Sequence, residues 1–161
     1  MAPSVFENKM FSYVQNNLRI LSGFYGVLKP MDGVVPYRLE MQAKTNIDGV
    51  KGLYNFWGSR LYEEVIDDTH IIVNLASKEY SKCIEKYLKP EDQYITCVFG
   101  EISNGKVVQK GTYAKMARGE MVRFMAENNI SEIEDIKGFD RLGYKYSVEQ
   151  STDVQFVFVK E

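Results

Sequence analysis

The stretch HIIVNLASKEY, residues 70–80, joins a short apolar run to a polar one. An apolar run of this length between polar residues is typical of a β-strand that is covered on both faces. Ser77 follows the run and is a favourable N-cap residue, which predicts a helix over residues 78–88. A covered strand that leads into a helix indicates a fold in which helices pack against a sheet.

Helical signals lie on both sides of this stretch. Apolar residues recur at every fourth position and predict an amphipathic helix over residues 53–67: Leu53, Trp57, Leu61 and Val65. A second long helix is expected over residues 112–128. Two Ser–Glu pairs have the spacing of a capping box: Ser4 with Glu7, and Ser131 with Glu134. They predict a helix that begins near residue 4 and a short helix that ends at residue 137.

Strand signals fill most of the remaining sequence. Strands are predicted over residues 18–21, 37–44, 94–103, 106–110, 143–149 and 154–160. Asn104 and Gly105 predict a hairpin turn, and the last two strands are expected to pair in antiparallel fashion. Because helices and strands do not alternate strictly, we predict a single α+β (mixed α/β) domain over residues 1–161, with a mixed sheet flanked by helices.

The composition disfavours several functional classes. The chain has 161 residues and a net charge of −2, so phosphate binding would need a local basic patch. Cys83 and Cys97 lack CxxC spacing and His70 is the single histidine, so we predict neither a metal site nor a cofactor. Because the sequence has no stretch of membrane-spanning length and no signal-peptide pattern at its start, we expect a cytoplasmic protein.

The segment LSGFYGVLKPMDGVVPYRLEM, residues 21–41, is rich in glycine, proline and tyrosine and carries the pair Arg38 and Glu40. On the strand expected at residues 37–44, these two side chains share one face. They are either an exposed ion pair of little energetic value or an anion clamp, with Glu40 orienting Arg38 or acting as an acid or base. Tyr25, close to Lys29, either packs a turn or stacks on a base beside a phosphate contact.

Basic residues gather on the expected helix at residues 112–128. Lys115 and Arg118 lie opposite its apolar side, Arg123 lies at their edge, and Gly119 sits between them. This face is either a solvated basic surface with a glycine used in helix packing or a contact surface for phosphate.

A third polar group follows the buried strand: Asn74, Ser77 and Glu79. The point where a strand ends and a helix begins is a frequent ligand site, although simple capping by Ser77 explains the residues equally well. His70, which precedes the strand, is expected to be a hydrogen-bonded structural residue.

Four separated blocks of the sequence resemble the YaaA family of bacterial peroxide-stress-response proteins. They are LRILSGFYGVLKPMDGVVPYRLEM (18–41), LYNFWG (53–58), VNLASKEY (73–80) and YAKMARG (113–119). Their order and spread over the chain make the resemblance specific. Family members are longer, so we expect this chain to match their C-terminal two-thirds and to lack an N-terminal portion.

The resemblance implies a cytoplasmic protein of the hydrogen peroxide response that binds DNA through a positively charged cleft. The residues it suggests for this cleft are Tyr25, Lys29, Arg38, Lys115, Arg118 and Arg123. Glu40 would then hold Arg38, with Asn74, Ser77 and Glu79 as a supporting polar cluster. Since neither cysteine lies in a context that lowers the pKa of a thiol, such as a basic cluster at a helix N-terminus, a peroxidase is disfavoured.

Two rival functions remain open from the residues. The protein is an enzyme if Arg38, Glu40, Lys115 and Arg118 form one pocket for a phosphorylated or nucleobase substrate. It is instead a small-molecule sensor, or a fragment completed by another chain, if an apolar sheet edge is exposed.

Overall fold

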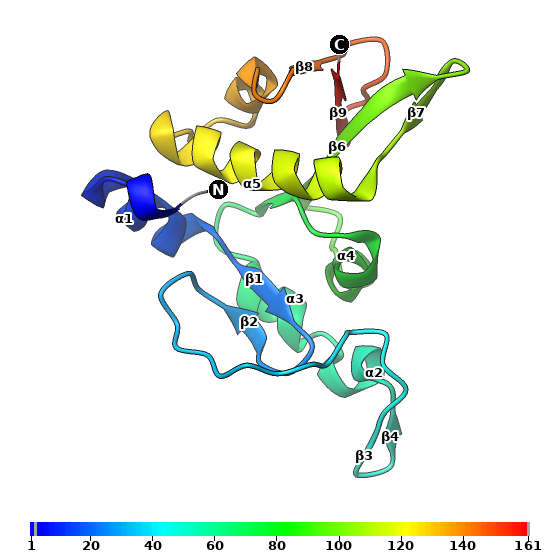
Figure 1. The fold of residues 1–161 in the computed structure, drawn as a ribbon. Coiled ribbons are helices and arrows are strands. Elements are labelled where there is room, and N and C mark those ends of the chain that lie inside the picture. Colours follow the sequence, from blue (N-terminus) through cyan, green and yellow to red (C-terminus); the bar gives the residue numbers. More distant parts are fainter. Residues whose placement is uncertain (2, 161) are drawn as a thin grey trace. The chain divides into compact units, whose positions relative to one another are not determined.

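The computed structural model describes residue 1 and residues 3–160. The chain forms two compact units. Unit 1 comprises Met1–Asn17, Val73–Leu75 and Ile95–Glu161, and unit 2 comprises Leu18–Ile72 and Ala76–Tyr94. That residues 1–161 form a single domain stays a prediction. Figure 1 shows the elements in chain order.

Unit 1 contains the two longest helices. These are α1 (Asn8–Asn17) and α5 (Gly111–Glu127), which contact each other (Figure 1). The long helix predicted at residues 112–128 is therefore confirmed within one residue at each end. The predicted start at Ser4 is wrong, because Pro3–Val5 forms a 3-10 turn (η1) closed by the Phe6 N–H on the Pro3 carbonyl at 3.0 Å. The helix begins only after this turn has ended.

A mixed sheet provides the other layer of unit 1. Its strand order is β5-β6-β9-β8, with β7 paired to β6: β5 (Ile71–Asn74), β6 (Gln93–Ser103), β7 (Lys106–Val108), β8 (Tyr144–Tyr146) and β9 (Gln155–Lys160). Strands β6 and β9 are parallel, whereas β7 and β8 run antiparallel to their partners. The first residues of β5 and β6 belong to unit 2. The predicted α+β class, the Asn104–Gly105 hairpin and the final antiparallel pair are confirmed.

Aromatic rings fill the core of unit 1. Phe99 and Phe158, which face each other across the parallel pair β6 and β9, are fully buried and stacked, with their ring centroids 5.1 Å apart. Phe139 and Tyr144 contact Phe99 edge-on at 5.7 and 5.6 Å. Alternation along β6 places Ile95, Cys97 and Phe99 on the same buried face.

The segment before β8 also differs from expectation. Residues 133–138 form a 3-10 helix, η2 (Ile133–Gly138), whose preceding residue makes no side-chain capping bond. The capping box predicted for Ser131 and Glu134 is therefore absent. Instead, Glu134 accepts a 2.6 Å hydrogen bond from the Lys137 ammonium, which uses the carboxylate that the box requires.

Unit 2 combines two small hairpins with three helices. The hairpins are β1 (Ile20–Ser22) with β2 (Gly26–Leu28), and β3 (Asn46–Ile47) with β4 (Val50–Lys51). The helices are α2 (Leu53–Trp57), α3 (Arg60–Val65) and α4 (Lys78–Glu85). The single helix predicted at residues 53–67 is broken because Gly58 has φ 56° and ψ −136°, a conformation that no helix accommodates.

Residues 37–44 form no strand, although the burial that predicted one is present. Met41 is fully buried and Leu39 packs on the core of unit 2, whereas Arg38 and Glu40 are exposed. Within the described part of the chain, no neighbouring strand pairs with this segment. Alternating burial alone does not make a strand when the hydrogen-bonding partners are elsewhere.

No helix within residues 1 and 3–160 combines the length and apolar character needed to cross a lipid bilayer.

Candidate nucleic-acid interface

Ser22 organises the turn that opens the glycine-rich segment. Its buried hydroxyl oxygen accepts hydrogen bonds from the N–H groups of Phe24 (3.2 Å) and Tyr25 (2.9 Å). The same oxygen forms a short hydrogen bond with the Tyr37 hydroxyl. One serine therefore fixes both the β1–β2 turn and the far end of the loop that follows β2.

Two glycines in this segment are explained by packing. A side chain at Gly23 would place its Cβ 2.7 Å from the Leu39 carbonyl oxygen. Gly26 has φ +83°, and a Cβ there would lie 2.9 Å from the Trp57 ring. Trp57 also donates its indole N–H to the Gly23 carbonyl at 3.1 Å. These glycines allow the loop and Trp57 to approach the hairpin, which does not require a ligand.

Tyr25 is tied into the protein by both ends of its side chain. Its hydroxyl accepts a hydrogen bond from the Val35 N–H at 3.0 Å, and its ring lies edge-on to Phe24 and Tyr37. Phe24 and Tyr37 have exposed fractions of 54% and 41%, so they are the accessible members of this cluster. The sequence reasoning selected Tyr25 and missed these two, because neighbouring aromatic residues carry no signal about which ring is outermost.

The charged residues of the loop are exposed. Lys29, Arg38 and Glu40 lie on the surface of unit 2, and no ion pair joins any of them to another described residue. The prediction that Glu40 holds Arg38 is therefore wrong, because the strand that would align their side chains is absent. Both cations are available to an external anion.

Arg118 on α5 is the most unusual cation of unit 1. Its side chain is half-buried, and its Nε is inaccessible to solvent and lacks a hydrogen-bond partner among the described residues. Its Nη2 donates a long hydrogen bond, 3.4 Å, to the Gln109 amide oxygen. Burial without a carboxylate lowers the pKa of the guanidinium. Lys115, one turn earlier, is exposed.

The close approach to Gly119 agrees with one of the two predicted alternatives. A Cβ at Gly119 would lie 3.1 Å from the Met1 amino nitrogen, which also pairs with the Glu120 carboxylate at 3.6 Å. A chain segment of the protein therefore approaches this glycine, as the packing alternative expects.

Arg123, by contrast, is neutralised. Its Nε lies 2.7 Å from one oxygen of Glu127, whose other oxygen lies 3.0 Å from Arg141 Nη2. The paired charges raise the pKa of Arg123 and lower the pKa of Glu127. Arg123 is therefore occupied in a side-chain network of unit 1.

The three residues of the predicted polar cluster have separate structural roles. Asn74 belongs to unit 1, where its amide N–H donates to the Thr96 hydroxyl at 3.2 Å. Ser77 and Glu79 belong to unit 2, and Ser77 occupies the N-cap position of α4, as predicted, without a side-chain capping bond. The Glu79 carboxylate accepts from the Gln42 N–H at 3.2 Å and so attaches the loop to α4.

The four residues that would form the pocket of the enzyme alternative are also divided between the two units. Arg38 and Glu40 belong to unit 2, and Lys115 and Arg118 belong to unit 1. Glu40 is exposed, an environment that does not favour an acid–base role.

A hydrogen-bonded triad in unit 2 was not foreseen from the sequence. His70 Nδ1 lies 2.9 Å from one oxygen of Asp92, and the other oxygen accepts from the Tyr62 hydroxyl and the Lys89 N–H, both at 2.7 Å. The Lys89 N–H and the His70 ring lower the pKa of Asp92 to about 2, while burial and the carboxylate raise the pKa of Tyr62 to about 12. His70 is hydrogen-bonded, as predicted, but its partner is 22 residues away.

The two cysteines are free and buried. Burial raises the pKa of Cys83 to about 11 and that of Cys97 to about 12, so both thiols stay protonated. No group of three or more His, Cys, Asp or Glu side chains placed to hold a metal ion occurs in the part of the chain that the structure describes.

Comparison with known proteins gives a consistent family match. The family model described as "Peroxide stress protein YaaA" matches residues 1–150. A "UPF0246 protein" of Agathobacter rectalis is 66% identical over 161 residues, which is 100% of this chain and 65% of the relative. UPF0246 proteins of Desulfitobacterium hafniense and Pediococcus pentosaceus are 58% and 53% identical over 160 residues, covering 99% of this chain and 64% of each relative. The chain thus spans slightly less than two-thirds of the length of these relatives.

Proposed function

The chain belongs to the YaaA peroxide stress protein family, and from this membership we propose that it is a cytoplasmic protein that binds DNA through local basic surfaces and thereby limits damage by hydrogen peroxide. On unit 1 the proposed phosphate contacts are Lys115 and Arg118. On unit 2 they are Lys29 and Arg38. Tyr25, whose hydroxyl is already bonded to Val35, takes a supporting role beside the exposed Phe24 and Tyr37.

The observation that carries this proposal is the unpaired state of Arg118. A partly desolvated guanidinium without a carboxylate is stabilised by an incoming phosphate, which supplies the missing negative charge. Arg123, five residues further along α5, has the opposite environment, because Glu127 already neutralises it. We therefore place the proposed contact on Lys115 and Arg118 and omit Arg123.

The test is a salt titration of the binding of the full chain to labelled duplex, bulged and single-stranded DNA. Each phosphate contact contributes roughly one unit to the slope of log affinity against log salt. Lys115→Ala with Arg118→Ala is expected to weaken binding and to flatten the slope by about two units. Lys106→Ala, which removes an exposed charge of unit 1 outside this surface, serves as the control and should leave the slope nearly unchanged. An unchanged slope in the double variant, or no binding by the folded chain, would contradict the proposal.

A second experiment addresses protection. DNA exposed to hydrogen peroxide and ferrous iron is nicked, and the number of nicks should fall when the bound protein covers it. The double variant should give less protection at the same protein concentration. If both proteins protect equally while binding differs, the protective effect does not depend on DNA binding, and that part of the proposal fails.

A further inference from the structure

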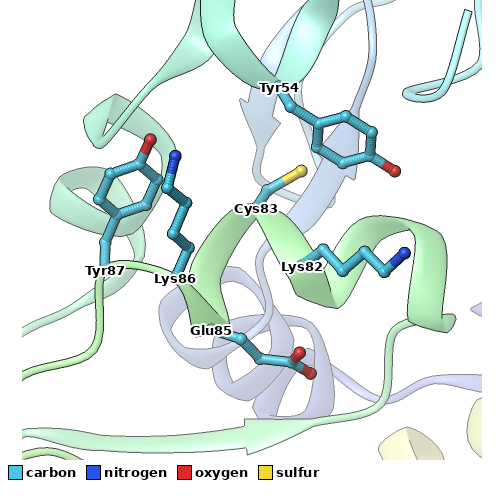
Figure 2. A pocket seen from close by; sticks show the side chains of 6 residues that line it. All are labelled: Tyr54, Lys82, Cys83, Glu85, Lys86 and Tyr87. Carbon is cyan, nitrogen blue, oxygen red and sulfur yellow. The ribbon is translucent and has the colours of Figure 1, made fainter.

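Unit 2 contains a pocket that the proposed DNA contacts do not use. It lies between Tyr54 of α2 and the side of α4 and the residues directly after it, and its volume is about 420 Å³ (Figure 2). The residues that line it are Tyr54, Lys82, Cys83, Glu85, Lys86 and Tyr87. This volume is within the range of about 300–1,000 Å³ that is usual for small-molecule sites.

The buried residue of the lining, Cys83, is uncharged. The Cys83 side chain has an exposed fraction of only 4%, and its raised pKa of about 11 keeps the thiol neutral. Tyr54 is held by a 2.9 Å hydrogen bond from its hydroxyl to the Glu79 carbonyl oxygen. Tyr54 and Tyr87 thus offer ring surfaces on either side of a polarizable sulfur, an arrangement suited to a planar aromatic group.

The rim of the pocket carries an excess of positive charge. Lys82 and Lys86 are one helical turn apart and exposed, and neither forms an ion pair with a described residue. The Lys86 ammonium lies 5.4 Å from the centroid of the Tyr87 ring. Glu85, the only acid of the lining, interacts with the Tyr94 hydroxyl, and Figure 2 shows its carboxylate directed away from Lys86 and Tyr87.

One acidic neighbour lies outside the lining. Glu79, one turn before Cys83, accepts a hydrogen bond from the Gln42 N–H through its carboxylate, which holds this carboxylate toward the Gln42 backbone. From the buried Cys83 sulfur, the rings of Tyr54 and Tyr87 and the lysines without an ion pair, we propose that the pocket binds a small molecule in which a planar aromatic ring carries one anionic group. The ring packs on Tyr54, Tyr87 and Cys83, and the anion is attracted by Lys82 and Lys86, whose ammonium groups lie on opposite sides of Cys83 in Figure 2. This inference is independent of DNA binding.

Aromatic carboxylates and aromatic phosphates share this chemistry, so the experiment uses one of each. The isotope-labelled full chain is titrated with 2-naphthoate and with adenosine 5′-monophosphate, and the amide shifts of Lys82, Cys83 and Tyr87 are followed by NMR. The neutral 2-naphthalenemethanol and inorganic phosphate are the ligand controls. The amides of α5 in unit 1 are the internal reference, because the pocket is lined by unit 2 alone.

Saturable shifts confined to the pocket amides with either aromatic anion, and weaker binding of both controls, would support the proposal. Lys82→Ala with Lys86→Ala should then weaken binding about five- to tenfold, a size typical of two exposed charge contacts. Lys78→Ala with Lys89→Ala, exposed lysines that do not line the pocket, is the matched control and should bind as the wild type does. Tyr87→Ala, which removes one ring and keeps both lysines, should also weaken binding.

Three results would overturn the proposal. The first is the absence of saturable shifts at the pocket amides with both anions. The second is equal binding by the Lys82/Lys86 variant and its matched control. The third is equal affinity for the anion and for 2-naphthalenemethanol, since the lysines would then have no role.

Discussion

The two units each contain an aromatic cluster, and the clusters are held together by different forces. In unit 1, Phe99 and Phe158 are fully buried and stacked, and other rings surround them. In unit 2, Phe24 and Tyr37 are largely exposed, and the loop between them is fixed by hydrogen bonds to Ser22 and Tyr25. A dry cluster contributes to stability through packing. A hydrogen-bonded loop instead holds apolar and charged side chains at the surface, where they are available to a partner.

The largest effect is expected where packing dominates. Phe99→Ala should lower the free energy of unfolding of unit 1 by about 3–5 kcal/mol, because it removes a fully buried ring and leaves a cavity. Hydrogen exchange of the β6 and β9 amides measures this loss directly. A cost below about 1 kcal/mol would mean that the core collapses around the missing ring, and the contrast between the clusters would fail.

A smaller loss is expected where hydrogen bonds dominate. Ser22→Ala leaves the Phe24 and Tyr25 N–H groups and the Tyr37 hydroxyl without their partner, at a cost of about 1–3 kcal/mol. Urea unfolding followed by the fluorescence of Trp57, the single tryptophan and a residue of unit 2, provides the measurement. Ser59→Ala is the control. Ser59 occupies the N-cap position of α3 but makes no side-chain capping bond, so its replacement should change the free energy of unfolding by about 0.5 kcal/mol or less. Equal effects of the two variants would show that Ser22 does not hold the loop.

The polar interactions of unit 2 also predict an acid sensitivity. The folded protein lowers the pKa of Asp92 to about 2, below the value of about 3.9 expected in the unfolded chain. The stabilisation by this carboxylate is therefore complete above pH 4 and is lost as the pH falls toward 2. Trp57 fluorescence between pH 2 and 5 should report this loss. Asp92→Asn should be less stable at neutral pH and should show a weaker dependence on pH over this range.

The smallest effect is expected when a phenylalanine is replaced by alanine at an exposed position of unit 2. This substitution can be compared directly with Phe99→Ala in the buried cluster of unit 1. Phe24→Ala should cost about 1 kcal/mol or less, since the side chain is 54% exposed and its ring contacts are those with Tyr25 and Tyr37. The readout is again Trp57 fluorescence during urea unfolding. A loss as large as that of Phe99→Ala would show that the loop is part of a packed core.

Elements with strong local signals could be predicted from the sequence. The β6–β7 hairpin and α5 follow from Asn104–Gly105 and from a long helical periodicity, both contained within a few turns of chain. Elements that depend on a partner elsewhere in the chain could not be predicted in this way. Residues 37–44 have the alternation of a strand but no strand beside them, and Gly58 divides a regular apolar spacing into α2 and α3.

The same limit applies to the candidate site. The exposure of Lys29, Arg38 and Lys115 agrees with a role for charged residues at the surface. The unpaired state of Arg118 and the neutralisation of Arg123 depend on which residues approach α5 from elsewhere in the chain, and helical spacing does not contain this information. The bond between His70 and Asp92 was invisible for the same reason.

The position of β9 between β6 and β8 has a consequence for biosynthesis. Strand β6 leaves the ribosome about 50 residues before β9, which spans Gln155–Lys160, and its parallel partner is missing during that interval. All of unit 2 has been synthesised by then, because its last residue is Tyr94. The nascent chain thus carries an open sheet edge beside uncovered phenylalanines, the kind of surface that chaperones bind and that aggregates when translation stalls.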